Sequence, residues 1–469
     1  MVGRGIRRAL HGAALAALLM LPSQVEAQAL ETLTLKKALE MGYRANLNLE
    51  STRETLTGLK HLESASYREM FPTMKLTVTR VDILDQSNAT DNSKPESYTA
   101  KAAVTQPIFK GGSLWSTWKS AELATDKGKL DVIRQEQTLI KDIKTAWYSL
   151  LKAAYLRDEA EETLGRLNQH AKNAEAFFAE GRYWRNEVLQ AQVKVAQGAQ
   201  SLIAAENTLE LAKSTLNQLL KRPLDAEFNV EGKLAKVPFT WTLNDAMSLA
   251  QAKRPDLESA RIDIKVGKWS EVSTTAAILP DVSLVADYLW TGVDKDFNVS
   301  TTRKGTATIT ATWDIWGWGS SVQDIKAAQS DNKVYKHTYE NLIDTIALEV
   351  KTAYLSADEA FKQLPVLQKS LNQAEENFKV NQVRYQEQLG TATDVLDALD
   401  LLTTSRSSYV TAIATYLTSL ADLEYYVGVQ DATGEDIGAQ AGELLPKLGT
   451  IPVRSATAKP ANEVVTSAQ

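Results

Sequence analysis

The sequence predicts a mainly α-helical protein with a transmembrane β part, built from duplicated long helical hairpins and four β-strands per chain. Three observations indicate this class. The chain of 469 residues contains two copies of one layout, its longest segments keep a helical spacing of apolar residues over many turns, and four short runs alternate apolar with polar residues. Together these patterns predict helical rods that carry strands at one end.

The two copies are related by an offset of about 208 residues. Thr34-Leu35 returns as Thr242-Leu243, and Lys144–Ala146 returns as Lys351–Ala353. The offset drifts by only about one residue between these two matches, so the two halves share one architecture. A repeat of this length indicates a pseudo-two-fold unit, and such units often form part of a larger ring.

Residues 1–27 have the features of a secretory signal peptide. Three Arg precede an apolar run from Ala9 to Leu21, and Val25–Ala27 fits a cleavage site. The apolar run has 13 residues. That is too short to span about 30 Å of hydrocarbon, which disfavours the alternative of a membrane anchor. We therefore expect an exported protein.

Composition disfavours several classes of function. Without residues 1–27, which hold three Arg and one Glu, the chain keeps 49 basic and 57 acidic residues, a net charge of −8. This charge disfavours a nucleic-acid partner. The chain has no Cys, its four His show no metal-ligand spacing, and it lacks phosphate loops and nucleophile motifs. We therefore expect no catalytic residues, no metal, no cofactor and no enzymatic activity.

The first repeat is predicted over residues 28–221 and the second over 242–428, with a linker at 222–241 and a largely irregular tail at 429–469. Each repeat is predicted as a helix, two strands, a long helix and a return helix. In the first repeat these are 34–70, 73–79, 98–106, 114–180 and 186–221. In the second they are 242–278, 282–290, 305–313, 321–388 and 393–427. Pro72 and Pro280 end the first helices, and Pro365 is expected to interrupt and kink the second long helix.

The helix lengths predict a bundle. At about 1.5 Å per residue, each long helix makes a rod of about 100 Å. A return helix flanks the distal half of the rod, and the first helix of the repeat flanks the half next to the strands. This predicts roughly four helices per chain at any height along the rod.

The strand runs have one apolar and one polar face, and aromatic residues crowd in or beside them. A soluble β-sandwich would need a second apolar face, and a lone hairpin is marginally stable in water. One apolar face with interfacial aromatics is typical of a transmembrane barrel. Four strands cannot close such a barrel, so the chain is predicted to oligomerise. The predicted membrane-interface aromatics are Tyr98, Trp115, Tyr288, Trp290, Trp313 and Trp316.

Three segments in this order resemble the TolC family of outer-membrane channel proteins. They are Gln106–Gly112, its degenerate copy Trp313–Gly319, and the hairpin-tip signature Arg384-Tyr385, Gly390 and Asp394–Ala398. The resemblance covers roughly residues 30–428. It implies a homotrimer in the outer membrane, in which four strands per chain complete a 12-stranded β-barrel that continues into an α-barrel tunnel in the periplasm.

The resemblance also implies passive transport, either multidrug or metal efflux or type I secretion. Its partners would be a periplasmic adaptor protein and an inner-membrane pump or ABC exporter, with outer-membrane lipid around the barrel. The hairpin tips would dock the adaptor through Gly181, Arg182, Tyr183, Leu389, Gly390 and Thr391. Gly390 lies two positions later than the family's usual tip glycine, whereas Gly181 lies at the usual position.

By the same resemblance, Asp394 and Asp397 would ring the periplasmic entrance and form its gate, with Glu187 and Gln190 as their counterparts in the first hairpin. Carboxylates gathered around one narrow axis repel one another and select for cations. The alternative is that both Asp only stabilise a helix N-terminus. Two alternatives are disfavoured. A soluble periplasmic coiled-coil adaptor or scaffold is disfavoured because no Gly-rich β block separates the hairpin arms, and a periplasmic enzyme is disfavoured because a catalytic site is missing.

Overall fold

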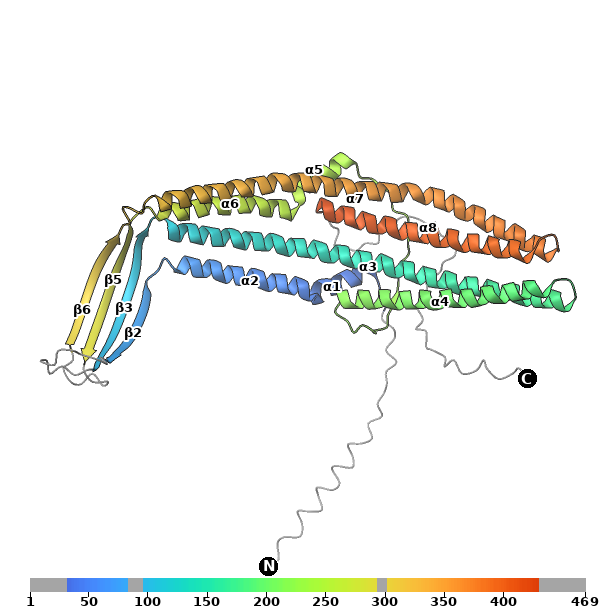
Figure 1. Cartoon of the computed structure of the whole chain (residues 1–469), viewed down its shortest axis with the longest axis horizontal. Helices are drawn as coiled ribbons and strands as arrows, with labels where there is room; N and C mark the ends of the chain where they lie inside the picture. The colour runs from blue at the N-terminus through green and yellow to red at the C-terminus, as the bar shows by residue number, and fades with distance from the viewer. Residues whose placement is uncertain (1–31, 83–95, 293–301, 430–469) are drawn as a thin grey trace, which may run out of the picture.

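The computed structural model describes residues 32–82, 96–292 and 302–429. Long helices run from a β-sheet at one end to two hairpin tips at the other (Figure 1). The signal peptide expected at 1–27 and nearly all of the tail expected at 429–469 lie outside the described residues. No helix within these three ranges combines the length and the apolar character that a membrane span requires.

Two helices of equal length form the rods. Helix α3 spans Ser113–Ala179 and α7 spans Ser320–Gln386. Each turns back at its tip into a return helix, α4 (Arg185–Leu219) or α8 (Ala392–Val427). Next to the sheet, α2 (Leu47–Arg68) and α6 (Pro255–Ala276) pack on the rods instead. The bundle therefore has four helices in each half, as the lengths predicted.

The sequence predicted one unbroken first helix in each repeat, and this prediction is wrong. In both repeats the first helix breaks after about three turns. Helix α1 (Leu35–Ala45) ends at Asn46, whose side chain accepts hydrogen bonds from the next helix at 3.0 and 3.1 Å. Helix α5 (Leu243–Lys253) ends at Arg254, which precedes Pro255. Asn is a strong N-cap, and the residue before Pro is disfavoured in the α conformation. Both break residues have ψ near 120°.

Pro365 lies inside helix α7, where the sequence predicted an interruption and a kink. Helix α7 continues through Pro365 without a break, and Figure 1 shows it as one gently bowed rod. Proline cannot donate the backbone hydrogen bond of a helical turn, and a long helix accommodates the missing bond by bending.

The strands β2 (Thr73–Asp82), β3 (Glu96–Lys110), β5 (Asp281–Gly292) and β6 (Thr302–Thr312) form one antiparallel sheet in the order β2-β3-β5-β6. They extend beyond the predicted strand ranges, except that Trp313 lies just after β6. The pairing of β3 with β5 joins the two repeats. Strands β2 and β6 are left as open edges of the sheet.

The linker between the repeats packs against the middle of the bundle, which the sequence did not predict. Its Phe228, Leu234 and Val237 are buried in the main core with Trp147 of α3. The Tyr416 hydroxyl of α8 donates a 2.8 Å hydrogen bond to the Val237 carbonyl. Two short strands, β1 (Thr32–Leu33) and β4 (Asn229–Val230), pair in parallel beside it. The linker thus ties the first hairpin to the second.

Candidate functional site

The sheet has one predominantly apolar and one predominantly polar face, although Leu289 lies on the polar face and Arg303 lies beside Trp290 on the apolar face. Successive residues of a strand point to opposite faces, so the register assigns every residue to a face. One face carries Met74, Leu76, Val78, Ala100, Ala102, Val104, Leu284, Ala286, Tyr288, Trp290, Ala307 and Ile309. Met74 is 84% exposed and Leu76 70% exposed. A continuous exposed apolar surface of this kind marks contact with another molecule or a membrane.

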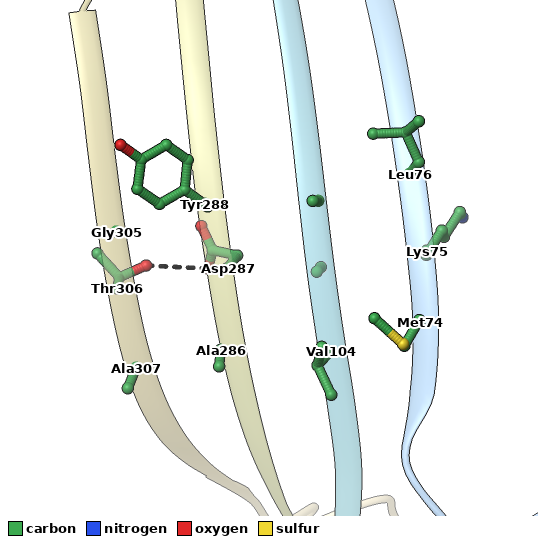
Figure 2. A pocket seen from close by; sticks show the side chains of 12 residues that line it. Met74, Lys75, Leu76, Val104, Ala286, Asp287, Tyr288, Gly305, Thr306 and Ala307 are labelled. Carbon is green, nitrogen blue, oxygen red and sulfur yellow. Dashed lines mark hydrogen bonds between the residues drawn. The ribbon is translucent and has the colours of Figure 1, made fainter.

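The opposite face is lined by threonines and a few charges. These threonines are Thr73, Thr77, Thr79, Thr99, Thr105, Thr291, Thr302, Thr306, Thr308 and Thr310. Figure 2 shows Thr306 turned toward Asp287 of the neighbouring strand, to which its hydroxyl donates a 2.9 Å hydrogen bond. The Lys101 ammonium lies 3.8 Å from the same carboxylate. This face suits contact with water and solutes.

The predicted interface aromatics fall into two groups. Tyr98, Tyr288 and Trp290 lie in the strands, and the rings of the last two are 4.5 Å apart. Trp115, Trp313 and Trp316 lie where the sheet meets the helices. There Trp313 donates a 3.1 Å hydrogen bond from its indole to the Ile278 carbonyl.

The junction between sheet and helices also holds aromatics outside the predicted set. Trp118 packs on Trp115 at 4.8 Å and lies under the Lys119 ammonium. Trp318, at 89% exposure, packs on Trp316 at 5.9 Å. The Trp-rich repeat motif at 313–319 is the sequence signal that marks this end of α7.

The first hairpin tip turns at Gly181, which has φ of +73°. The Arg182 amide closes the turn with a 2.9 Å bond to the Phe177 carbonyl. In the second tip the Leu389 amide bonds to the Arg384 carbonyl at 2.8 Å.

The left-handed residue of the second tip is Gln388, with φ of +62°, and not Gly390. Gln388 is therefore the counterpart of Gly181. This explains why Gly390 lies two positions late in the sequence: it follows the turn instead of making it.

An aromatic cluster joins the two tips inside one chain. The rings of Tyr183 and Tyr385 stack in parallel with centroids 5.4 Å apart. Phe177 packs edge-on against both, and His170 lies 5.0 Å from Tyr385. Tyr385 is only 2% exposed. Tyr183, which was predicted to dock a partner, packs against the other hairpin and stays half-buried. His170 and Phe177 were missed, because helical spacing does not show which rods meet.

Polar atoms of this tip cluster are buried without hydrogen-bond partners among the described residues. They are the hydroxyls of Tyr183 and Tyr385, Nε2 of His170 and Oε2 of Glu187. Burial raises the pKa of Tyr183, Tyr385 and Glu187 and lowers the pKa of His170. Leaving buried polar groups unpaired costs free energy, so separating the hairpins would hydrate them. The packing of the two tips therefore carries a free-energy cost at these polar groups.

The predicted gate carboxylates differ in their surroundings. Asp394 forms a capping box at the start of α8: its carboxylate accepts a 2.9 Å bond from the Thr391 amide, and its own amide donates to the Thr391 hydroxyl at 3.2 Å. The bond from the Thr391 amide lowers the pKa of Asp394. Asp397 is exposed one turn later, and Gln190 is exposed on α4, whereas Glu187 is half-buried. Asp394 thus has a structural role in addition to any role in a gate.

Comparison with known proteins decides the family. The sequence profile of outer membrane efflux proteins matches residues 65–221 and 246–429. The chain belongs to the outer membrane efflux protein family. The pyoverdine export outer membrane protein OpmQ of Pseudomonas aeruginosa is 22% identical over 344 residues, which cover 73% of this chain and 71% of OpmQ.

Solved structures of outer-membrane channels share the fold of this efflux protein. The outer membrane protein VceC of Vibrio cholerae superposes with a TM-score of 0.71 at 16% identity, over 84% of this chain and 96% of VceC. The outer membrane channel CmeC of Campylobacter jejuni gives a TM-score of 0.72 at 16% identity, over 86% and 89% of the two chains. These values confirm the mainly helical fold with a β part, and the profile match confirms the predicted family.

Membership of this family makes the chain an efflux channel protein of the outer membrane with a long periplasmic helical part. The family consists of channels that work with adaptor proteins and pumps, and it is not a class of enzymes. A soluble adaptor is therefore not supported. Within the three described ranges, no group of three His, Asp or Glu side chains is arranged to hold a metal ion.

Proposed function

We propose that three copies of this efflux protein form a passive channel that conducts substrates from the periplasm to the cell exterior. The observation that carries this proposal is a four-stranded sheet with two open edges and one exposed apolar face. Open edges and apolar surface are both costly in isolation, and closing a barrel in lipid removes both costs.

The topology of the sheet fits a cyclic trimer. Strands β2 and β6 run in opposite directions because three antiparallel pairings separate them. The β6 edge of one copy can therefore pair with the β2 edge of the next in an antiparallel ladder. Three copies of the four-stranded sheet would close a barrel of twelve strands, an even number as such barrels require. The four helices at each height would line the tunnel below it.

The supply of substrate belongs to partners. We propose that a periplasmic adaptor docks on the hairpin tips and that an inner-membrane pump or ABC exporter provides the energy. Multidrug or metal efflux and type I secretion are the candidate pathways. Efflux of a pyoverdine-type molecule is favoured over protein secretion by the relative OpmQ, which is named for pyoverdine export.

Cysteine cross-linking tests the trimer, and the chain offers a clean background because it has no Cys. Thr77→Cys in β2 would be combined in turn with Thr302→Cys, Thr306→Cys or Thr308→Cys in β6. Within one chain β2 and β6 are three strand spacings apart, about 14 Å. A disulfide needs Cα atoms within about 7 Å, so it can form only between chains. Thr77→Cys with Lys101→Cys, paired within one chain, is the matched control.

We expect oxidation of membranes to give covalent trimers from at least one of the β2–β6 pairs and only monomers from the control. Monomers from every β2–β6 pair would refute the closed trimer. Covalent trimers from the control would show that the bonds arise from random collision.

We further propose that Asp394 and Asp397 narrow and charge the periplasmic entrance. Replacing both with Ala should raise single-channel conductance in planar bilayers and weaken block by multivalent cations, because up to six carboxylates leave one axis. Thr391→Ala is the control, since it removes the capping hydroxyl at a cost of about 1 kcal/mol and keeps both carboxylates. If Thr391→Ala changes conductance as much as the double variant does, the two Asp act only on the helix end.

The docking role of the tips is tested best at Gly390. Its backbone is not left-handed, and an added Cβ would lie 3.4 Å from the Cβ of Arg384, an ordinary contact. Gly390→Ala should therefore leave export unchanged. Gly390→Trp should abolish export, because a bulky side chain blocks close approach of an adaptor, while the outer-membrane level stays normal. Normal export by Gly390→Trp would place docking elsewhere on the rods.

A further inference from the structure

The charges on the polar face of the sheet are gathered in its central rows. One row across the strands holds Lys75, Ala103, Asp287 and Thr306, and the next holds Thr77, Lys101, Leu289 and Lys304. The two rows are two residues apart along the strands, about 7 Å. All three lysines therefore lie in one short band, which we call the lysine band: Lys75, Lys101 and Lys304.

The lysine band has an excess of positive charge. Asp287 is the one acidic residue among the described positions of these two rows, and Lys101 and Thr306 already contact its carboxylate. Toward the helices, Lys110 pairs in register with Asp281, so that row is neutral. The remaining positions of the polar face in the described strands are uncharged. One chain thus presents a net charge of +2 on this face.

The opposite, apolar face decides where the lysines point. Because the apolar face would contact lipid, the polar face must line the lumen of the barrel. Figure 2 shows Lys75 on the edge strand β2 and Asp287 on β5, at the same level of the sheet. A low-dielectric wall focuses the field of such charges into the channel, and the two rows are separated by less than a Debye length at physiological salt.

We propose that the β part of this channel selects for anionic solutes, so that the exported substrates carry net negative charge. This inference rests on the proposed trimeric channel. Three copies would place nine lysines and three aspartates around the lumen, a net charge of +6 on a wall otherwise lined by threonine hydroxyls. Ammonium groups attract carboxylate and phosphate as point charges, and the hydroxyls offer hydrogen bonds without selecting for sign.

The two ends of the channel then have opposite charge. Asp394 and Asp397 make the tip acidic, whereas the lysine band makes the exit basic. An anion that a pump has delivered past the opened tip meets an attractive potential at the exit. A free anion in the periplasm meets a repulsive potential at the closed tip. The fixed charges of a passive channel set which solutes pass, whereas the pump's delivery of substrate sets the direction of net flow.

Block of single channels by tripolyphosphate tests the inference. Tripolyphosphate is added to the sheet side of a planar bilayer, and its half-blocking concentration is compared among variants. Replacing Lys75, Lys101 and Lys304 together with Gln should raise that concentration on the order of ten-fold or more, because local counter-ion enrichment by a charged cleft is lost. Replacing the same three with Arg keeps the charge and should keep the block. Asp287→Asn should strengthen the block.

The outcomes separate this inference from the proposed channel. If the wild-type protein forms no pores in the bilayer, the proposed channel is refuted, and the proposed anion selection by the lysine band is refuted with it. If pores form but the Gln and Arg triple variants are blocked equally by tripolyphosphate, the channel stands and anion selection by the lysine band is refuted. The reversal potential in a salt gradient gives an independent measurement. A shift toward cation preference in the Gln triple variant but not in the Arg triple variant would support the inference.

Discussion

The assignment of the two sheet faces makes a sharp prediction at neighbouring residues of β6. Ile309 lies on the apolar face and is 69% exposed in the chain, whereas Thr308 lies on the polar face. Both positions would be changed to Asp. The two variants gain the same charge in adjacent positions of the same strand. Their comparison therefore isolates the surroundings of each side chain from the loss of strand propensity.

The expected magnitude depends on what covers Ile309. If water covers Ile309, a substitution at so exposed a site should change the free energy of unfolding by no more than about 0.5 kcal/mol, apart from the difference in strand propensity. The whole scale of strand propensity spans about 1 kcal/mol. In the hydrocarbon layer a buried charge on the lipid face of a barrel costs about 2 kcal/mol per chain. Three chains would triple this cost in one assembly. Ile309→Asp should therefore lose most of its outer-membrane population, and Thr308→Asp should keep it.

The assay is outer-membrane fractionation followed by quantification of the trimer that resists mild detergent. Equilibrium unfolding from lipid vesicles gives the free energy of each variant directly. Equal outer-membrane levels of the two variants, with unfolding free energies that agree within about 0.5 kcal/mol, would refute the assignment of the faces and the lipid contact inferred from it.

Three further predictions concern the tips and the core. Gly181→Ala should lower the free energy of unfolding by about 1–2 kcal/mol and Gln388→Gly should raise it, because both sites need a left-handed backbone. Urea titrations in which the two variants do not change the free energy of unfolding in opposite directions would contradict this turn geometry. Burial keeps His170 neutral, with a pKa below the ordinary 6.5. As the pH drops below 6.5, His170 binds a proton in the unfolded chain before it does in the folded chain, so stability should decrease. His170→Gln should therefore show a smaller loss of thermal stability between pH 7.5 and pH 5.5 than the wild-type protein. Lys144 and Glu424 form a buried ion pair of 2.7 Å. Lys144→Met should therefore lower the free energy of unfolding by about 3–5 kcal/mol in chemical unfolding, because it leaves the Glu424 carboxylate buried and unpaired. If the double variant Lys144→Met with Glu424→Gln is no more stable than Lys144→Met alone, the pairing is contradicted.

Local patterns were sufficient for much of the fold. The duplicated layout, the two long helices and the four strands follow from periodicity, because a 3.6-residue or two-residue period reports which face of an element is covered. The apolar face of the sheet, with Met74 and Ile309, could be read from alternation alone. The breaks at Asn46 and Arg254 also had local signals, an N-cap residue and a following proline, which the longer helical pattern obscured.

Other features depend on which elements meet in space. Periodicity does not show that β3 pairs with β5, which leaves β2 and β6 as the open edges. Tyr183 and Tyr385 are 202 positions apart in the chain, and only the packing of the two hairpins stacks their rings.

The left-handed Gln388 likewise has no signal in its residue type, because the hairpin closure imposes that backbone. The sequence by itself therefore determined the elements, their faces and the family. The tertiary structure decided the sheet order, the turn residue, the aromatic tip cluster and the gathering of three lysines into one band. These depend on contacts between distant segments, which no local period records.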